Sequence, residues 1–301
     1  MRQYLNTQRA LATTAMLSVL MAAGLTVGVS TPALAEFEIQ ESEVEKGESE
    51  LEYRGAVHWG VPKGEGDEGD GDDDDDEVGG GGILAEEGEG LRQSHEIEFQ
   101  YGVTERILLS TTLIADEPVD SDFDLSGVEL EGQYEIIERE GGAFGLAFIG
   151  AYGFATRSGG ADEIEFGPII ELGNGPLLLT FNPFFAAQVG SNRESGGLGF
   201  EYGWRGEYKV AQRWGVGVEM FGEIEQLAHS GPFDDQAHSI GPTLFYNPGG
   251  DDSIGGLGGD DDDDEIAGEP EMEFVFNVGL QFGLTDAASD TALKFQGAIE
   301  F

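Results

Sequence analysis

The sequence predicts an all-β membrane protein: a transmembrane, antiparallel, up-and-down β-barrel of about twelve strands, with ten or fourteen left open. Three observations predict it. Apolar and polar residues alternate in segments of about ten residues, the length of a tilted membrane strand. The chain ends on such a segment, with Phe301 as its last residue. Short connections alternate with longer polar ones, as turns and loops do at the two ends of bacterial outer-membrane barrels.

Residues 1–35 have the pattern of a signal peptide. Arg2 and Arg9 precede an apolar stretch over 10–29, and Ala33 and Ala35 form an Ala-x-Ala cleavage site. We expect cleavage after Ala35, export through the general secretory pathway and residence in the bacterial outer membrane. Residues 36–47 are then expected as a periplasmic N-terminal segment, followed by the barrel over 48–301.

The charge of the chain is strongly negative, with 60 acidic residues against 14 lysines and arginines and a formal net charge of −46. Such a field repels nucleic acid, so we expect no nucleic-acid partner. The absence of cysteine excludes disulfides and thiol chemistry. After the predicted leader, no apolar run approaches the roughly 20 residues of a membrane-spanning helix.

The alternating segments give the strands in order, with tight turns at 103–105, 139–142, 173–176 and 211–213 on the periplasmic side. Two acidic connections, 60–92 and 248–270, are expected to be disordered loops because runs of like charge bordered by glycine cannot bury a core. Strand parity puts 248–270 in the periplasm, against the rule of short periplasmic turns. The expected strands lie near 48–59, 93–103, 106–115, 125–138, 143–156, 162–172, 177–189, 198–210, 214–226, 236–247, 271–283 and 291–301.

The last strand distinguishes a membrane barrel from a soluble sandwich, which could produce the same alternation by burying its apolar face. Phe295, Ile299 and Phe301 share one face of this strand. Such a C-terminal strand is the feature that the barrel-assembly machinery recognises. We therefore interpret these three residues as an assembly signal, with the assembly machinery, outer-membrane lipid and lipopolysaccharide as partners.

Charged residues of the strands fall on the face opposite the aromatic one, so they are expected to line the lumen, because a charge facing hydrocarbon is costly. This favours a water-filled, cation-preferring pore for small solutes. The alternative is a closed barrel with a structural network of acids, bases and water. The expected lumen residues are the acidic Glu96, Glu98, Glu129, Glu131, Glu163, Glu165, Glu201, Glu207, Glu219 and Glu223 and the basic Arg54, Arg205, Lys209 and Lys294.

Two aspartate runs offer oxygen ligands of the kind that Ca²⁺ and Mg²⁺ prefer. Neither has the ligand spacing of an EF-hand loop, so we expect loose divalent binding, no defined metal site and no cofactor. A second hypothesis follows: a non-conducting surface barrel tied to lipopolysaccharide through divalent cations. The runs are Asp72, Asp73, Asp74, Asp75 and Asp76, and Asp260, Asp261, Asp262, Asp263 and Asp264.

No catalytic constellation is present in the sequence, so we do not expect an enzyme. His238 is directly followed by Ser239, and neighbours on one strand point to opposite faces, so they cannot form a nucleophile and base pair.

Segments 101–109, 238–242 and 282–286 resemble those of a group of proteobacterial outer-membrane barrels near the family named for the MetA pathway of phenol degradation. The resemblance covers most of the chain after the leader. It implies a passive transport role for small solutes and supplies no active-site residue. It leaves the oligomeric state open.

Overall fold

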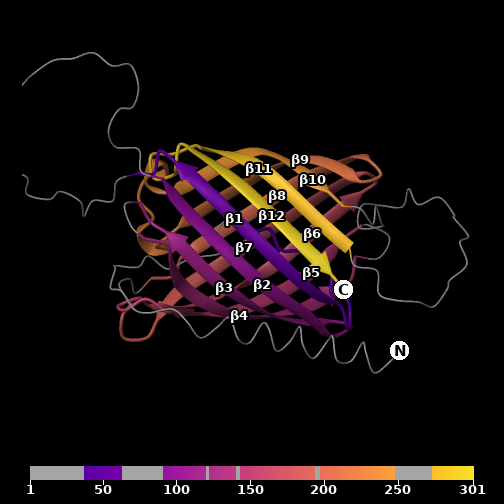
Figure 1. Cartoon of the computed structure of the whole chain (residues 1–301), viewed down its shortest axis with the longest axis horizontal. Coiled ribbons are helices and arrows are strands. Elements are labelled where there is room, and N and C mark those ends of the chain that lie inside the picture. Colours follow the sequence, from indigo (N-terminus) through magenta and orange to yellow (C-terminus); the bar gives the residue numbers. More distant parts are fainter. Residues whose placement is uncertain (1–36, 63–90, 120–121, 140–142, 194–196, 248–272) are drawn as a thin grey trace, which may run out of the picture.

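The chain forms a closed antiparallel β-barrel, in which each strand pairs with its neighbours along the chain and β1 pairs with β12 (Figure 1). The computed structural model describes residues 37–62, 91–119, 122–139, 143–193, 197–247 and 273–301. Outside these residues lie the predicted leader, most of the loop 60–92, the whole loop 248–270 and therefore both aspartate runs.

The predicted fold class is confirmed, and in the described residues the strand count is twelve. Every strand end lies within two residues of its predicted place. The strands are β1 (Ser49–Trp59), β2 (Arg92–Thr104), β3 (Ile107–Glu117), β4 (Asp124–Ile137), β5 (Gly145–Ala155), β6 (Asp162–Asn174), β7 (Leu177–Val189), β8 (Phe200–Ala211), β9 (Trp214–Ile224), β10 (Ala237–Tyr246), β11 (Glu273–Gly283) and β12 (Thr291–Glu300). Two short 3-10 turns, η2 (Leu227–His229) and η3 (Phe233–Asp235), connect β9 to β10.

Alternation along each strand separates an apolar outer face from a mostly polar inner face. In β7, Leu179 and Phe181 are exposed on the outside, whereas Thr180 and Asn182 are buried inside. Because the ring is closed, its backbone groups pair between strands and the apolar outer face can meet lipid. A small apolar cluster inside the barrel joins Ala147, Ile149, Ile169 and Phe184. In the part of the chain described, no helix is long and apolar enough to cross a membrane.

The two ends of the barrel differ. At one end, here called the turn end, short turns join β2 to β3, β4 to β5, β6 to β7 and β8 to β9. Gly175 in the β6–β7 turn has a φ of +58°, which glycine adopts at little cost. The strands that flank the long 248–270 connection, β10 and β11, also meet at this end, as strand parity predicts. The opposite end is called the loop end.

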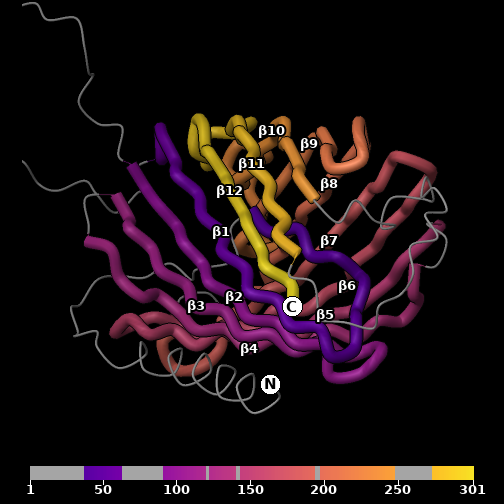
Figure 2. The backbone as a smooth tube through the Cα atoms, turned by 45° about the vertical axis from the view of Figure 1, so that its right-hand side comes forward, coloured from indigo at the N-terminus to yellow at the C-terminus, as the bar shows by residue number. Residues whose placement is uncertain are grey.

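Residues 37–47, here called the lumen segment, lie inside the barrel. Figure 2 shows the indigo trace running along the interior before it turns into β1. The backbone of Gln40 bonds to Asn182 of β7, and the Glu41 carbonyl accepts a bond from Gln133 of β4. For residues 37–47, this corrects the expectation of a periplasmic segment over 36–47; residue 36 lies outside the described residues. The physical reason is that the acidic side chains of this segment meet basic side chains on the inner wall.

Candidate functional site

The inner wall of the barrel is the candidate functional site. The strand register places the predicted lumen residues on inward-facing positions, where they alternate with outward apolar side chains. The acids on these positions are Glu96, Glu98, Glu129, Glu131, Glu163, Glu165, Glu201, Glu207, Glu219 and Glu223, and the bases are Arg54, Arg205, Lys209 and Lys294.

Arg54 of β1 is the centre of the largest ion-pair network. Its guanidinium lies 2.6 Å from Glu38, 2.7 Å from Glu52, and 2.9 Å from both Glu96 and Glu98. The Arg54 residue is only 6% exposed. A guanidinium offers five N–H donors in one plane, so one arginine can serve several carboxylates. The network therefore joins the lumen segment to β1 and β2.

A second ion pair joins β12 to β9. The Lys294 ammonium lies 2.6 Å from a Glu219 oxygen, and the Thr243 hydroxyl donates to the same oxygen at 2.7 Å. Both charged side chains are almost fully buried. Removing one partner of such a pair would leave an uncompensated buried charge, which is strongly destabilising.

Acids nearer the loop end have no such partners. In the residues that the structure describes, no ion pair involves Glu129, Glu163, Glu165 or Glu201, which we call the loop-end acids. The register puts Glu129 and Glu163 on one row, with Gly153 between them. Carboxylates that face one lumen without basic partners repel one another, and water or cations favour their ionised form.

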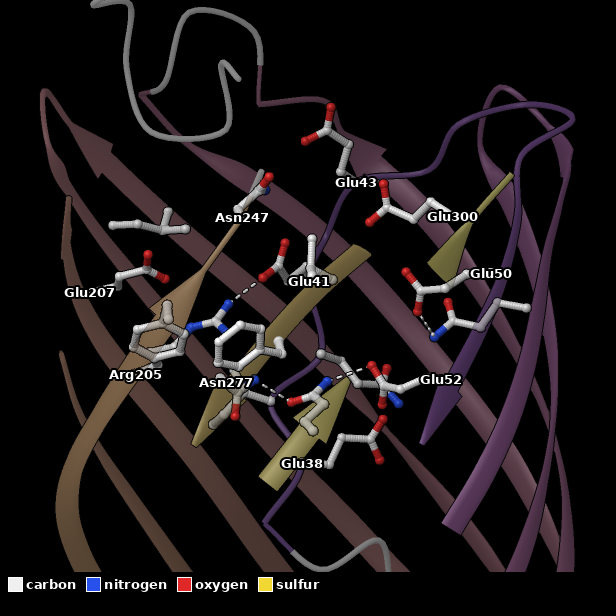
Figure 3. A pocket seen from close by; sticks show the side chains of 18 of the residues that line it. Glu38, Glu41, Glu43, Glu50, Glu52, Arg205, Glu207, Asn247, Asn277 and Glu300 are labelled. Carbon is white, nitrogen blue, oxygen red and sulfur yellow. Dashed lines mark hydrogen bonds and ion pairs between the residues drawn. The ribbon is translucent and has the colours of Figure 1, made fainter. Parts of the chain in front are cut away.

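A cavity of about 550 Å³ opens at the turn end, between the lumen segment and the wall (Figure 3). Figure 3 shows Glu41 and Arg205 joined across it by an ion pair, with Glu207 beside Arg205. Carboxylates dominate its lining, so the cavity presents negative charge to any solute entering from this end. The acids labelled there are Glu38, Glu41, Glu43, Glu50, Glu52, Glu207 and Glu300.

Outside the strands, burial raises the pKa of Glu48 from 4.5 to about 7, with the nearby Glu45 and Glu300 carboxylates acting in the same direction. Burial also raises the pKa of Glu43, although Arg139 opposes it. Glu48 lies where the chain turns from the lumen segment into β1. In this turn the Gly47 N–H donates to the Gly102 carbonyl at 2.7 Å, and the Gly102 N–H donates to the Glu48 carbonyl at 3.0 Å.

We expect this turn to loosen as the pH rises. A carboxyl group whose pKa is raised by folding contributes stability that is fully present below its unfolded pKa and is lost as pH rises through about 7. Hydrogen exchange of the Gly47 and Gly102 amides, corrected for intrinsic rates, should show that their protection falls as the pH rises from 4.5 to about 7. Glu48→Gln should remove the pH dependence, whereas Glu105→Gln, at an exposed turn residue, should keep it. An unchanged profile in Glu48→Gln would contradict the assignment.

The structure holds the histidine and serine of β10 apart. His238 points outward, where its ring stacks at 4.5 Å on Phe233 and the Tyr202 hydroxyl lies 3.0 Å from its Nδ1. Ser239 is paired across the strands with Phe221, on the inner side. Within the described ranges, no three His, Asp or Glu side chains are arranged to hold a metal ion. The aspartate runs 72–76 and 260–264 lie outside those ranges.

Sequence reasoning missed the lumen segment and Arg139. The Arg139 side chain is 2% exposed, and its Nε donates to Glu171 at 3.3 Å. The signal that could have indicated the segment is glycine at inward positions, since Gly102, Gly145 and Gly203 leave room on three different strands.

No protein-family model matches the chain, and no curated protein matches it. Among solved structures, it is similar to one described as the KdgM porin in complex with disordered oligogalacturonate, with a TM-score of 0.43, 8% identity, and 84% of this chain and 98% of that chain covered. It is also similar to the translocator domain of the autotransporter NalP from Neisseria meningitidis (TM-score 0.44, 11% identity, coverage 85% and 88%). A third is the CymD monoaromatic hydrocarbon channel (TM-score 0.38, 8% identity, coverage 86% and 88%).

Proposed function

We propose that this protein is a passive, cation-preferring channel for small solutes in the bacterial outer membrane. The observation that carries the proposal is the excess of inward carboxylates, among which the loop-end acids form no ion pair with any described residue. The leader expected over residues 1–35 and the outward aromatic and apolar face of β12, with Phe295 and Ile299, support export to the outer membrane. By this orientation the turn end faces the periplasm and the loop end faces the cell exterior.

The inner wall offers cations two groups of carboxylates, one near each end of the barrel. The loop-end acids come first from the outside, and the acidic cavity with Glu41, Glu43 and Glu207 follows towards the periplasm. Rings of carboxylates concentrate cations at a constriction and exclude anions. The bases Arg54 and Lys294 are neutralised by ion pairs, so they offer little attraction to anions.

In planar bilayers with a KCl gradient, we expect the purified protein to conduct and its reversal potential to favour K⁺ over Cl⁻. Replacing all four loop-end acids by glutamine should move the reversal potential towards zero by roughly half, because half or more of the selecting carboxylates on that side are lost. The matched control replaces four exposed acids, Asp122, Asp234, Asp235 and Asp286, by their amides, and this should change the reversal potential much less. Equal shifts in the two variants would show that total charge, not the lumen, sets the selectivity.

A second candidate function is the non-conducting surface barrel, and the lumen segment favours it because it occupies the interior. In this case the aspartate runs 72–76 and 260–264 bind Ca²⁺ or Mg²⁺ loosely, and the run 72–76, in the connection at the loop end, bridges the protein to lipopolysaccharide. Absence of conductance across several lipid compositions, in a variant lacking residues 37–46 as well as in the native protein, would favour this candidate over the channel.

A further inference from the structure

We propose that the lumen segment is a displaceable gate, held across the conduit by Arg54, Arg139 and Arg205 and hinged where the chain enters β1. The proposal rests on the channel function and adds its regulation. It is carried by the contacts that hold the segment in place and by the shape of the wall against which it lies.

Three ion pairs hold the acidic side chains of the segment. Glu38 meets Arg54 at 2.6 Å, Glu41 meets Arg205, and Glu43 lies 3.7 Å from Arg139. The three arginines come from β1, β8 and the residues just after β4, so the segment is held from several sides. The Lys294 ammonium adds a bond to the Phe37 carbonyl at 3.4 Å. The segment thus engages four basic side chains of the inner wall.

Polar side chains of the wall bind the segment's backbone. The Gln40 N–H donates to the Asn182 Oδ1 at 2.7 Å, and the Asn182 Nδ2 donates back to the Gln40 carbonyl at 3.1 Å. Gln133 donates to the Glu41 carbonyl at 3.0 Å. A buried backbone without partners would be costly, so these amides make the closed position of the segment specific.

Glycines on the wall make the space that the segment occupies. A Cβ added at Gly102 would lie 1.8 Å from the Glu45 carbonyl oxygen. At Gly203 it would lie 2.6 Å from Ile39 Cδ1, and at Gly145 it would touch the Ser42 hydroxyl. Any larger residue at these inward positions would push the segment away from the wall.

The contacts between the lumen segment and the wall are those of a displaceable gate rather than of a permanent part of the wall. The segment forms no strand, and its buried apolar residues are few, chiefly Ile39 and Val44. Two of the three ion pairs use half-exposed acids, since the side chains of Glu41 and Glu43 are 51% and 49% exposed, so salt screens these two pairs. The segment joins the barrel at Gly47, whose φ of +87° belongs to a tight turn. Releasing the ion pairs would let it swing towards the turn end.

The gate can be tested by crosslinking the lumen segment to the wall. The chain has no native cysteine, so two introduced cysteines would be the only sites of reaction. The double variant Gln40→Cys and Asn182→Cys is joined by a short methanethiosulfonate crosslinker, which reductant cleaves. We expect the joined protein to stay in a low-conductance state. After reduction, openings should appear with conductance at least about twofold higher, since a barrel of about twelve strands has a narrow lumen that the segment fills in part. The single-cysteine variants should respond neither to crosslinker nor to reductant.

A steric pair of variants tests the same idea without chemistry. Gly102→Ala should raise the open fraction, because its methyl group cannot share space with the Glu45 carbonyl. Gly150→Ala adds the same methyl group where nothing lies within 4 Å and should behave as the native protein does. Heat-modifiable gel mobility confirms that both variants are folded barrels.

A variant lacking residues 37–46 separates the failure of the gate from that of the channel. If it conducts freely while the crosslinked protein does not, the gate is supported. If native, crosslinked and deleted proteins conduct equally, the gate is overturned and the channel stands. If none conducts, both proposals are overturned.

Discussion

Replacing Phe301 by aspartate is expected to leave export across the inner membrane intact but to strand the protein in the periplasm. Phe301 ends the outward face of β12, and its backbone bonds to Ser49 in both directions, at 2.8 and 3.0 Å, where the barrel closes. Loss of the ring removes ~2 kcal/mol of apolar burial. A carboxylate there also faces lipid, which is unfavourable near the membrane boundary.

The neighbouring residue provides the control. Glu300→Gln changes the inward face of the same strand, since Glu300 pairs with Glu50 and Glu273, and it should assemble normally. Outer-membrane fractionation with heat-modifiable mobility measures both variants. Equal assembly of the two would mean that the terminal phenylalanine is not the recognition feature.

Arg54→Met is expected to destabilise the folded barrel by roughly 3–5 kcal/mol at neutral pH, because buried carboxylates lose their counter-charge. Four of them, Glu38, Glu52, Glu96 and Glu98, lie within 2.9 Å of this guanidinium. The loss should shrink as pH falls, since protonated carboxyl groups need no cation.

Urea unfolding in lipid vesicles, followed by gel mobility at pH 8 and pH 5, measures this effect. Arg193→Met, at an exposed loop residue, should change stability little at either pH. An Arg54→Met protein as stable as the native one at pH 8 would show that the network contributes nothing net to the fold.

The strands could be predicted because lipid on one side and water on the other impose a two-residue period on the sequence. The same period assigned Glu129 and Glu163 to the inner face without knowledge of their neighbours. The period could not predict that the two acids are neighbours. That follows from the register, because the pairing of β4, β5 and β6 puts them on one row.

The lumen segment could not be predicted in this way. Its residues have no strand period, and its charge is typical of a solvated linker. Its partners Arg54 and Arg205 are far apart in the chain, and the folded barrel brings each of them to an acid of the segment. Local sequence therefore contains the acids of the segment but not the geometry that collects its arginines.

The pairing of β1 with β12 has a kinetic consequence. Eleven of the twelve strand pairings join neighbours in the chain, whereas this one joins residues such as Glu50 and Glu300. Local hairpins form quickly, and contacts of long sequence separation form slowly. The last intermediate in assembly is then a curled sheet with two unpaired edges, which could pair with other chains. Any change that weakens the first strand's attraction for the last one prolongs the lifetime of that sheet, even when the finished barrel is equally stable.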